Sequence, residues 1–191
     1  MPPRMIVIAG PPGSGKSSIF PVSKFSVPYF NADDRAAALN GGSYHGLNTT
    51  IRQQVNKEFE AFIWNQIENR MSFAIETTLR SRVTFDQAAA AKSAGFTVEM
   101  RYLALSQFSQ HLERVMSRAD AGGHSASETT LRRIFDSSIA NLRQAIDQMD
   151  LLEVYDNSAP GGPPVIVLES RQGEIIFTAE AAPHWLLAAL D

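Results

Sequence analysis

The order of apolar and polar residues predicts strands and helices in alternation along most of the chain. Short apolar runs, typical of strands buried in a sheet, predict strands at 5–9, 27–31, 72–77, 96–105 and 151–155. Apolar residues at helical spacing predict helices at 32–39, 51–67, 83–94, 107–118 and 127–148. This alternation indicates an α/β fold, a mostly parallel five-stranded sheet flanked by helices.

The C-terminal part of the chain has a different pattern. A turn-rich connector at 157–164 precedes two short apolar runs at 165–168 and 174–177, which predict a β-hairpin. A short helix is expected at 180–190. No linker is long enough to separate two domains, so we expect one domain over 1–191, with the hairpin and helix at about 164–190.

Directly after the first predicted strand, residues 10–17 read G-P-P-G-S-G-K-S. They match G-x-x-x-x-G-K-[ST], a loop whose backbone N–H groups surround phosphate. Lys16 is expected to reach the β- and γ-phosphates, and the Ser17 hydroxyl to ligate Mg²⁺. The chain is therefore predicted to bind ATP or GTP with Mg²⁺, through Gly10, Pro11, Pro12, Gly13, Ser14, Gly15, Lys16, Ser17 and Ser18.

Composition narrows the class of protein. The formal net charge is −3, so no general basic field favours nucleic acid as a partner. The chain contains no cysteine, which excludes disulfides, thiol catalysis and cysteine-ligated metals. No apolar stretch approaches the ~18 residues of a membrane span, and no signal peptide is evident. We expect a cytoplasmic protein without a membrane partner.

Polar residues at the ends of the second and third predicted strands are candidates for acceptor chemistry. Asp33 and Asp34 follow the second strand, and Glu76 ends the third, with Thr78 and Arg80 just beyond. Parallel strands place such residues on one rim with the phosphate loop, where a carboxylate can accept the proton of a hydroxyl. Capping of the next helix is an alternative role for the two aspartates.

Two predicted helices joined by the glycines at 122–123 carry arginines and suggest a lid at about 114–133. Planar guanidinium groups suit phosphate oxygens. The alternative is a pair of solvated helix faces, with Glu113 and Glu128 as ion-pair partners. The arginines in question are Arg114, Arg118, Arg132 and Arg133.

Seven segments resemble the zeta toxin family of P-loop kinases. They are G-P-P-G-S-G-K-S, N-A-D-D, F-A-I-E-T-T-L, A-G-F-T-V-E-M-R-Y-L-A-L, R-V-M-S-R-A-D-A-G-G-H, L-R-R-I-F-D-S-S-I-A-N-L and V-Y-D-N-S, from about residue 5 to 158. The resemblance implies a P-loop NTPase fold, an ATP- or GTP-dependent kinase and an antitoxin partner. In zeta toxins the acceptor is the sugar 3′-hydroxyl of UDP-N-acetylglucosamine.

The resemblance also implies roles for individual residues. Asp33 would be the base, and Glu76, Thr78 and Arg80 would hold the sugar nucleotide. The lid arginines would contact the transferring phosphate. Two other functions fit the phosphate loop: an NTP-binding switch or regulated ATPase without a small acceptor, and a kinase for a nucleoside, an antibiotic hydroxyl or a nucleic-acid end.

Overall fold

A seven-stranded, mostly parallel sheet forms the centre of the molecule in the computed structural model, in the order β2-β3-β1-β4-β5-β6-β7. Residues 1–44, 46–120 and 126–190 are described, without the side chains of 118–120. The first five strands run parallel, and the last two are antiparallel. The strands are β1 (Arg4–Ala9), β2 (Tyr29–Phe30), β3 (Phe73–Thr77), β4 (Thr97–Ala104), β5 (Leu151–Asp156), β6 (Val165–Arg171) and β7 (Glu174–Thr178).

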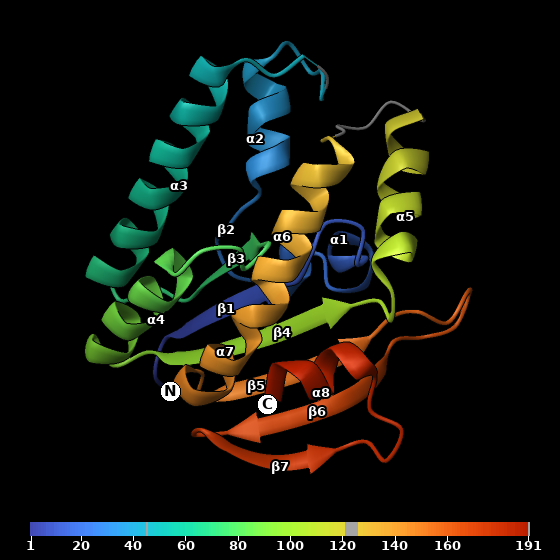
Figure 1. Cartoon of the computed structure of the whole chain (residues 1–191). Helices are drawn as coiled ribbons and strands as arrows, with labels where there is room; N and C mark the ends of the chain where they lie inside the picture. The colour runs from blue at the N-terminus through green and yellow to red at the C-terminus, as the bar shows by residue number, and fades with distance from the viewer. Residues whose placement is uncertain (45, 121–125, 191) are drawn as a thin grey trace.

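Helices occupy the segments between the parallel strands, and a last helix follows β7 (Figure 1). They are α1 (Lys16–Ile19), the short 3-10 helix η1 (Val22–Phe25), α2 (Ala32–Leu39), α3 (Thr49–Glu68), α4 (Val83–Ser93), α5 (Phe108–Asp120), α6 (Glu128–Ala140), α7 (Leu142–Gln148) and α8 (His184–Leu190). No helix within the described ranges is long and apolar enough to cross a bilayer.

The two faces of the sheet are covered differently. The larger core joins one face of the strands to apolar residues of α3, α4, α7 and α8, and includes Phe73, Tyr102 and Trp185. On the other face, Ile6 and Ile8 pack with Val22 from η1 in a smaller cluster. Burial of β1 on both faces explains its continuous apolar run, and it fixes the strand that leads into the phosphate loop.

Side-chain caps set several helix starts. Asn31 precedes α2 and accepts hydrogen bonds from the backbone N–H groups of Asp33 and Asp34, at 3.0 and 3.2 Å. Ser127 caps α6 by accepting from the N–H of Thr130 at 3.3 Å. These caps satisfy N–H groups that have no partner within the helix. The first places Asp33 in the first turn of α2, at the end of β2.

The fold differs from the sequence prediction at two points. The hairpin does not stand apart from the sheet: β6 pairs with β5, so the sheet has seven strands instead of five. The helix predicted over 127–148 is interrupted at Asn141, which separates α6 from α7. The glycine break of the expected lid lies within 121–125, outside the described residues.

Candidate active site

The phosphate loop follows β1 and is packed closely against neighbouring backbone. A Cβ on Gly10 would overlap the carbonyl oxygen of Leu103 in β4. A Cβ on Gly13 would lie 2.6 Å from the carbonyl oxygen of His111 in α5. Glycine is therefore required at both positions by close approach as well as by positive φ values of 137° and 80°. The loop is held between β4 and α5.

Lys16 begins α1 and folds back over the loop. Its side chain is buried, and Nζ donates hydrogen bonds to the carbonyl oxygens of Gly10 and Pro11, at 2.8 and 3.1 Å. Nζ also lies 3.9 Å from Oε1 of Glu76. The ammonium group is thus held within the loop, where it can exchange carbonyl oxygens for phosphate oxygens when a nucleotide binds.

Glu76 lies beside Ser17 because β3 is the neighbour of β1 in the sheet. The Ser17 hydroxyl donates to Oε2 and Oε1 of Glu76, at 3.0 and 3.3 Å. A hydroxyl and a carboxylate are hard oxygen donors of the kind that Mg²⁺ prefers. The described residues contain no cluster of three or more His, Cys, Asp or Glu that could hold a metal without further ligands. The pair therefore fits a Mg²⁺ ion that is also bound by phosphate.

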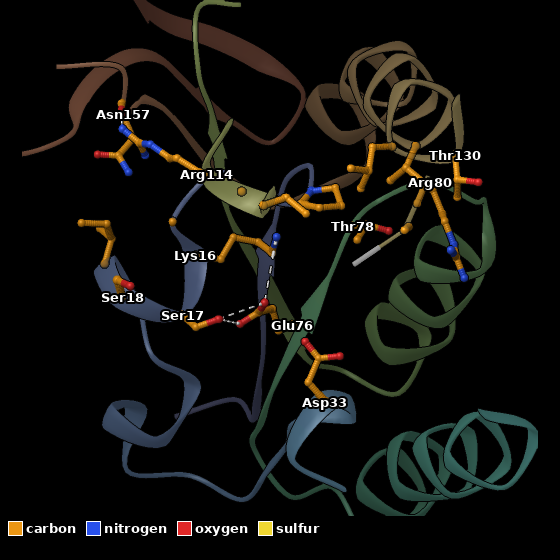
Figure 2. Close-up of a pocket in the computed structure, with 18 of the residues that line it drawn as sticks. Lys16, Ser17, Ser18, Asp33, Glu76, Thr78, Arg80, Arg114, Thr130 and Asn157 are labelled. Carbon is orange, nitrogen blue, oxygen red and sulfur yellow. Dashed lines mark hydrogen bonds and ion pairs between the residues drawn. The ribbon is translucent and has the colours of Figure 1, made fainter. Parts of the chain in front are cut away.

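One cavity of about 510 Å³ brings most of the predicted residues together. Figure 2 shows Arg114 on one side of Lys16, and Thr78 and Arg80 on the other. The cavity is large enough for a small-molecule site. Its predicted lining residues are Pro12, Gly13, Gly15, Lys16, Ser17, Ser18, Asp33, Glu76, Thr78, Arg80 and Arg114.

Six other predicted residues do not line this cavity: the loop residues Gly10, Pro11 and Ser14, together with Asp34, Arg132 and Arg133. The carboxylate of Asp34 accepts a hydrogen bond of 2.9 Å from the Tyr44 hydroxyl. The guanidinium of Arg132 lies over the Phe108 ring, 3.9 Å from its centroid, and Arg133 is exposed on the same helix. The side chain of Arg118 lies outside the described residues. Among the described lid arginines, only Arg114 reaches the cavity.

Three polar cavity residues were missed by sequence reasoning. Arg52 lies in the first turn of α3 and Thr130 in the first turn of α6, and both line the cavity. Asn157 follows β5, and its Nδ2 donates to the carbonyl oxygen of Ser14 at 2.9 Å. Arg114 donates to the carbonyl oxygen of Asn157 at 3.0 Å. The position of Asn157 at the end of a parallel strand is a signal that could have identified it.

His111 is a further missed residue and connects α5 to the phosphate loop. Its Nε2 accepts a hydrogen bond of 2.9 Å from the Leu105 N–H. Nδ1 lies 2.9 Å from the Pro12 carbonyl oxygen and must therefore carry the proton. Burial is the main cause that lowers the pKa of His111 to about 4, and nearby Lys16 and Arg114 act in the same direction. The imidazole is neutral at pH 7.

The cavity is more positive than the chain as a whole. Among its described lining residues, the cations are Lys16, Arg52, Arg80 and Arg114, and the anions are Asp33 and Glu76. Four positive and two negative groups give a formal charge of +2, whereas the whole chain carries −3. Such a local reversal of charge favours anionic ligands and raises their concentration at the site.

A mostly parallel sheet with a phosphate loop between its central strand and a helix defines the P-loop NTPase fold within the α/β class. The family model described as zeta toxin matches residues 48–160. The chain therefore belongs to the zeta toxin family. The matched region begins after the phosphate loop, so the assignment does not depend on that common motif.

Solved structures show the same fold at low sequence identity. AvrRxo1-ORF1 in complex with ORF2 and ATP has a TM-score of 0.72 and 16% identity over 96% of this chain. The PezAT toxin–antitoxin structure of Streptococcus pneumoniae has a TM-score of 0.64 and 13% identity, over 97% of this chain and 75% of the other. This chain spans only 64% of the matched AvrRxo1-ORF1 chain. No curated protein matches it.

Proposed function

We propose that the protein is a kinase that transfers the γ-phosphate of ATP to a hydroxyl group of UDP-N-acetylglucosamine. The observation that carries this proposal is the shared cavity, which is lined by Lys16 and Ser17 of the phosphate loop and also by Asp33. A switch or a simple ATPase needs a carboxylate such as Glu76 for its metal ion, but it needs no second carboxylate to activate an acceptor hydroxyl. Membership of the zeta toxin family supports the choice of acceptor.

The donor half of the site consists of the loop, Arg114 and Asn157. Loop N–H groups and Lys16 bind the phosphates, and Arg114 adds a cation from α5 where negative charge moves during transfer. Ser17 and Glu76 would hold Mg²⁺, which neutralises phosphate charge when it is bound. The sequence alone suggested an acceptor-binding role for Glu76, but its contact with Ser17 favours the metal side of the site.

The acceptor half begins at Asp33. In the proposed reaction, the acceptor oxygen attacks the γ-phosphorus, the bond from the γ-phosphorus to the bridging oxygen breaks, and ADP leaves. The proton of the hydroxyl passes to the Asp33 carboxylate, which acts as general base. The Asn31 side-chain oxygen accepts a hydrogen bond from the Asp33 N–H and so holds the Asp33 backbone in place at the start of α2.

The rest of the acceptor half suits a molecule that carries both a diphosphate and apolar surface. Arg52 and Arg80 supply positive charge away from the loop, where the diphosphate of a sugar nucleotide would bind. Leu131 and Ile134 of α6 form an apolar part of the wall. Thr78 provides a hydroxyl for hydrogen bonding to the sugar.

The proposal is tested by incubating the protein with ATP, Mg²⁺ and UDP-N-acetylglucosamine and analysing the nucleotides by mass spectrometry. We expect a sugar nucleotide that has gained one phosphoryl group, and ADP in equal amount. A 3-deoxy analogue of the sugar should give no product, and GTP in place of ATP tests the donor. Bound ATP without any phosphorylated sugar nucleotide would contradict the proposal and favour a switch or regulated ATPase.

We also propose one kinase domain over 1–191 with a lid at about 114–133, and an antitoxin protein as its partner. The lid proposal is supported by Arg114 and α6, which enclose the cavity from one side. The partner proposal is supported by PezAT, a toxin–antitoxin system. We expect a small protein to copurify with the chain and to suppress its kinase activity. Full kinase activity in that complex would contradict the proposal of an antitoxin partner.

A further inference from the structure

The turn that follows β3 contains a buried leucine with an unusual backbone conformation. Leu79 has a φ of 55°, in the left-handed region, and its side chain is fully buried in the main core. A bulky residue adopts this conformation only where its surroundings enforce it. Thr78 and Arg80, its two neighbours in the chain, both line the active-site cavity. The conformation of Leu79 therefore lies between two predicted acceptor-binding residues.

The segment from β3 into this turn alternates between the cavity and the core. Glu76, Thr78 and Arg80 line the cavity, whereas Ile75 and Leu79 belong to the buried cluster. Leu79 is thus the core anchor that separates Thr78 from Arg80. Because the left-handed residue turns the chain between them, the backbone of Leu79 determines how both side chains enter the cavity.

Both polar backbone groups of Leu79 are bound by side chains. Its N–H donates to Oγ1 of Thr77 at 3.2 Å. Its carbonyl oxygen accepts a hydrogen bond of 2.8 Å from Nδ2 of Asn141. Asn141 is the residue that interrupts the helix between α6 and α7. A distant side chain thus holds the carbonyl of the strained residue.

Asn141 also connects this turn to the opposite wall of the cavity. Leu131 and Ile134 line the cavity. Ser138 follows on the same face of α6, and Asn141 continues the helical spacing directly after α6 ends at Ala140. The Ser138 hydroxyl lies 2.9 Å from the Tyr102 hydroxyl of β4. The helix is therefore fixed to the sheet at Ser138 and to the acceptor turn at Asn141.

We propose that Asn141 is a positioning residue for the acceptor. Its amide maintains the left-handed conformation of Leu79, and through it the directions of Thr78 and Arg80. It also fixes their distance from the α6 wall. The inference rests on the proposed function for its acceptor, but the hydrogen bond and the buried turn are independent of that assignment.

The test compares Asn141→Asp with Asn69→Asp. The first change keeps the side-chain volume but replaces the N–H donor with an oxygen that repels the Leu79 carbonyl. Asn69 is the matched control, since its Nδ2 also donates to a backbone carbonyl, that of Asn65, at 2.8 Å. It lies at the end of α3 remote from Arg52. For Asn141→Asp we expect the KM for UDP-N-acetylglucosamine to rise about tenfold or more, as for other displaced positioning groups.

The KM for ATP should stay within about twofold of the wild-type value in both variants, because the side-chain hydrogen bond of Asn141 goes to Leu79 on the acceptor side of the site. An equal rise in both KM values, or the same change in Asn69→Asp, would overturn the proposal. If Asn141→Asp does not fold, Asn141→Ser, whose hydroxyl is too short to reach the carbonyl, takes its place with the same expectations.

A second measurement separates this proposal from the choice of acceptor. Hydrogen exchange of the amides at 78–82 should become about tenfold faster in Asn141→Asp than in Asn69→Asp, whereas the phosphate loop stays unchanged. If the wild-type protein does not phosphorylate UDP-N-acetylglucosamine, the proposed acceptor is wrong. The hydrogen-exchange result then tests by itself whether Asn141 positions the turn at 78–82. Unchanged exchange at 78–82 would overturn its positioning role.

Discussion

The stability of the protein should fall in mild acid because His111 is buried without charge. The neutral imidazole donates to the Pro12 carbonyl and accepts from the Leu105 N–H. A second proton on Nε2 would remove the acceptor and place a charge in the interior. Burial lowers the pKa of His111 from 6.5 to about 4. The unfolded chain therefore binds a proton near pH 6.5, whereas the folded protein binds it only near pH 4.

The size of the effect follows from this difference in pKa. Between these two pH values the unfolded state binds more protons, so the free energy of unfolding falls as the pH is lowered. At 1.36 kcal/mol per pKa unit, the full loss is about 3 kcal/mol below pH 4, and about 2 kcal/mol is already lost at pH 5. Above pH 6.5 the contribution is fully present.

Urea unfolding at pH 7.5 and pH 5.0 measures this loss. Other groups also titrate in this interval, so the comparison is made with His111→Gln, whose amide can both donate and accept but does not titrate. The wild-type protein should lose about 2 kcal/mol more than the variant between the two pH values. The exposed His184 provides the matched control, His184→Gln.

The result that would refute this reasoning is an equal pH dependence in the wild-type protein and His111→Gln. It would mean that the buried imidazole is not held neutral by its surroundings. If the free energy of unfolding falls by the same amount in His184→Gln and in His111→Gln between pH 7.5 and pH 5.0, the reasoning is refuted as well.

ATP affinity should also weaken over the same pH range, because His111 contacts the phosphate loop through Pro12.

Three further predictions concern the cavity. Glu76→Gln should raise the Mg²⁺ concentration for half-maximal activity about tenfold, measured by titrating Mg²⁺ at fixed ATP. Gly13→Ala should abolish ATP binding in calorimetry and lower the melting temperature, because its Cβ would lie 2.6 Å from the His111 carbonyl oxygen; normal binding would contradict the packing described. Arg114→Ala should raise the ATP Kd about tenfold, whereas Arg132→Ala should leave it unchanged and destabilise the protein by about 0.5–1 kcal/mol through the lost stacking on an aromatic ring. Equal effects of the two arginine variants on ATP binding would contradict the different positions of these side chains.

Local signals in the sequence were sufficient for most of the fold. The loop glycines and the apolar runs each depend on near neighbours in the chain, and the structure confirms the elements they predict. Capping was considered for Asp33 and Asp34, whereas the side chain that caps α2 is that of Asn31. The break at Asn141 could not be predicted in this way. The side chain of Asn141 donates a hydrogen bond to Leu79, 62 residues away, and helical spacing continues across the break, so no near neighbour in the chain marks it.

The site residues also divide into those that local sequence signals identify and those that depend on tertiary packing. Asp33 and Glu76 were found because the ends of parallel strands share one rim of the sheet. Arg52 enters the cavity from a helix and carries no such signal. Arg132 was predicted to be a lid arginine that contacts phosphate, but its guanidinium lies over the Phe108 ring. Sequence can identify a group of arginines, whereas the packing of each helix decides which of them reaches the cavity.

The central claim is that Asp33 and the phosphate loop serve one phosphotransfer reaction. Its most direct test is single-turnover transfer of labelled γ-phosphate from ATP to UDP-N-acetylglucosamine by the wild-type protein and by Asp33→Asn, with the ATP Kd measured in parallel. We expect transfer to fall by about 10²- to 10⁴-fold, the usual contribution of a general base, and the ATP Kd to stay within about twofold because Asp33 lies on the acceptor side. Transfer at the wild-type rate by Asp33→Asn would contradict the account.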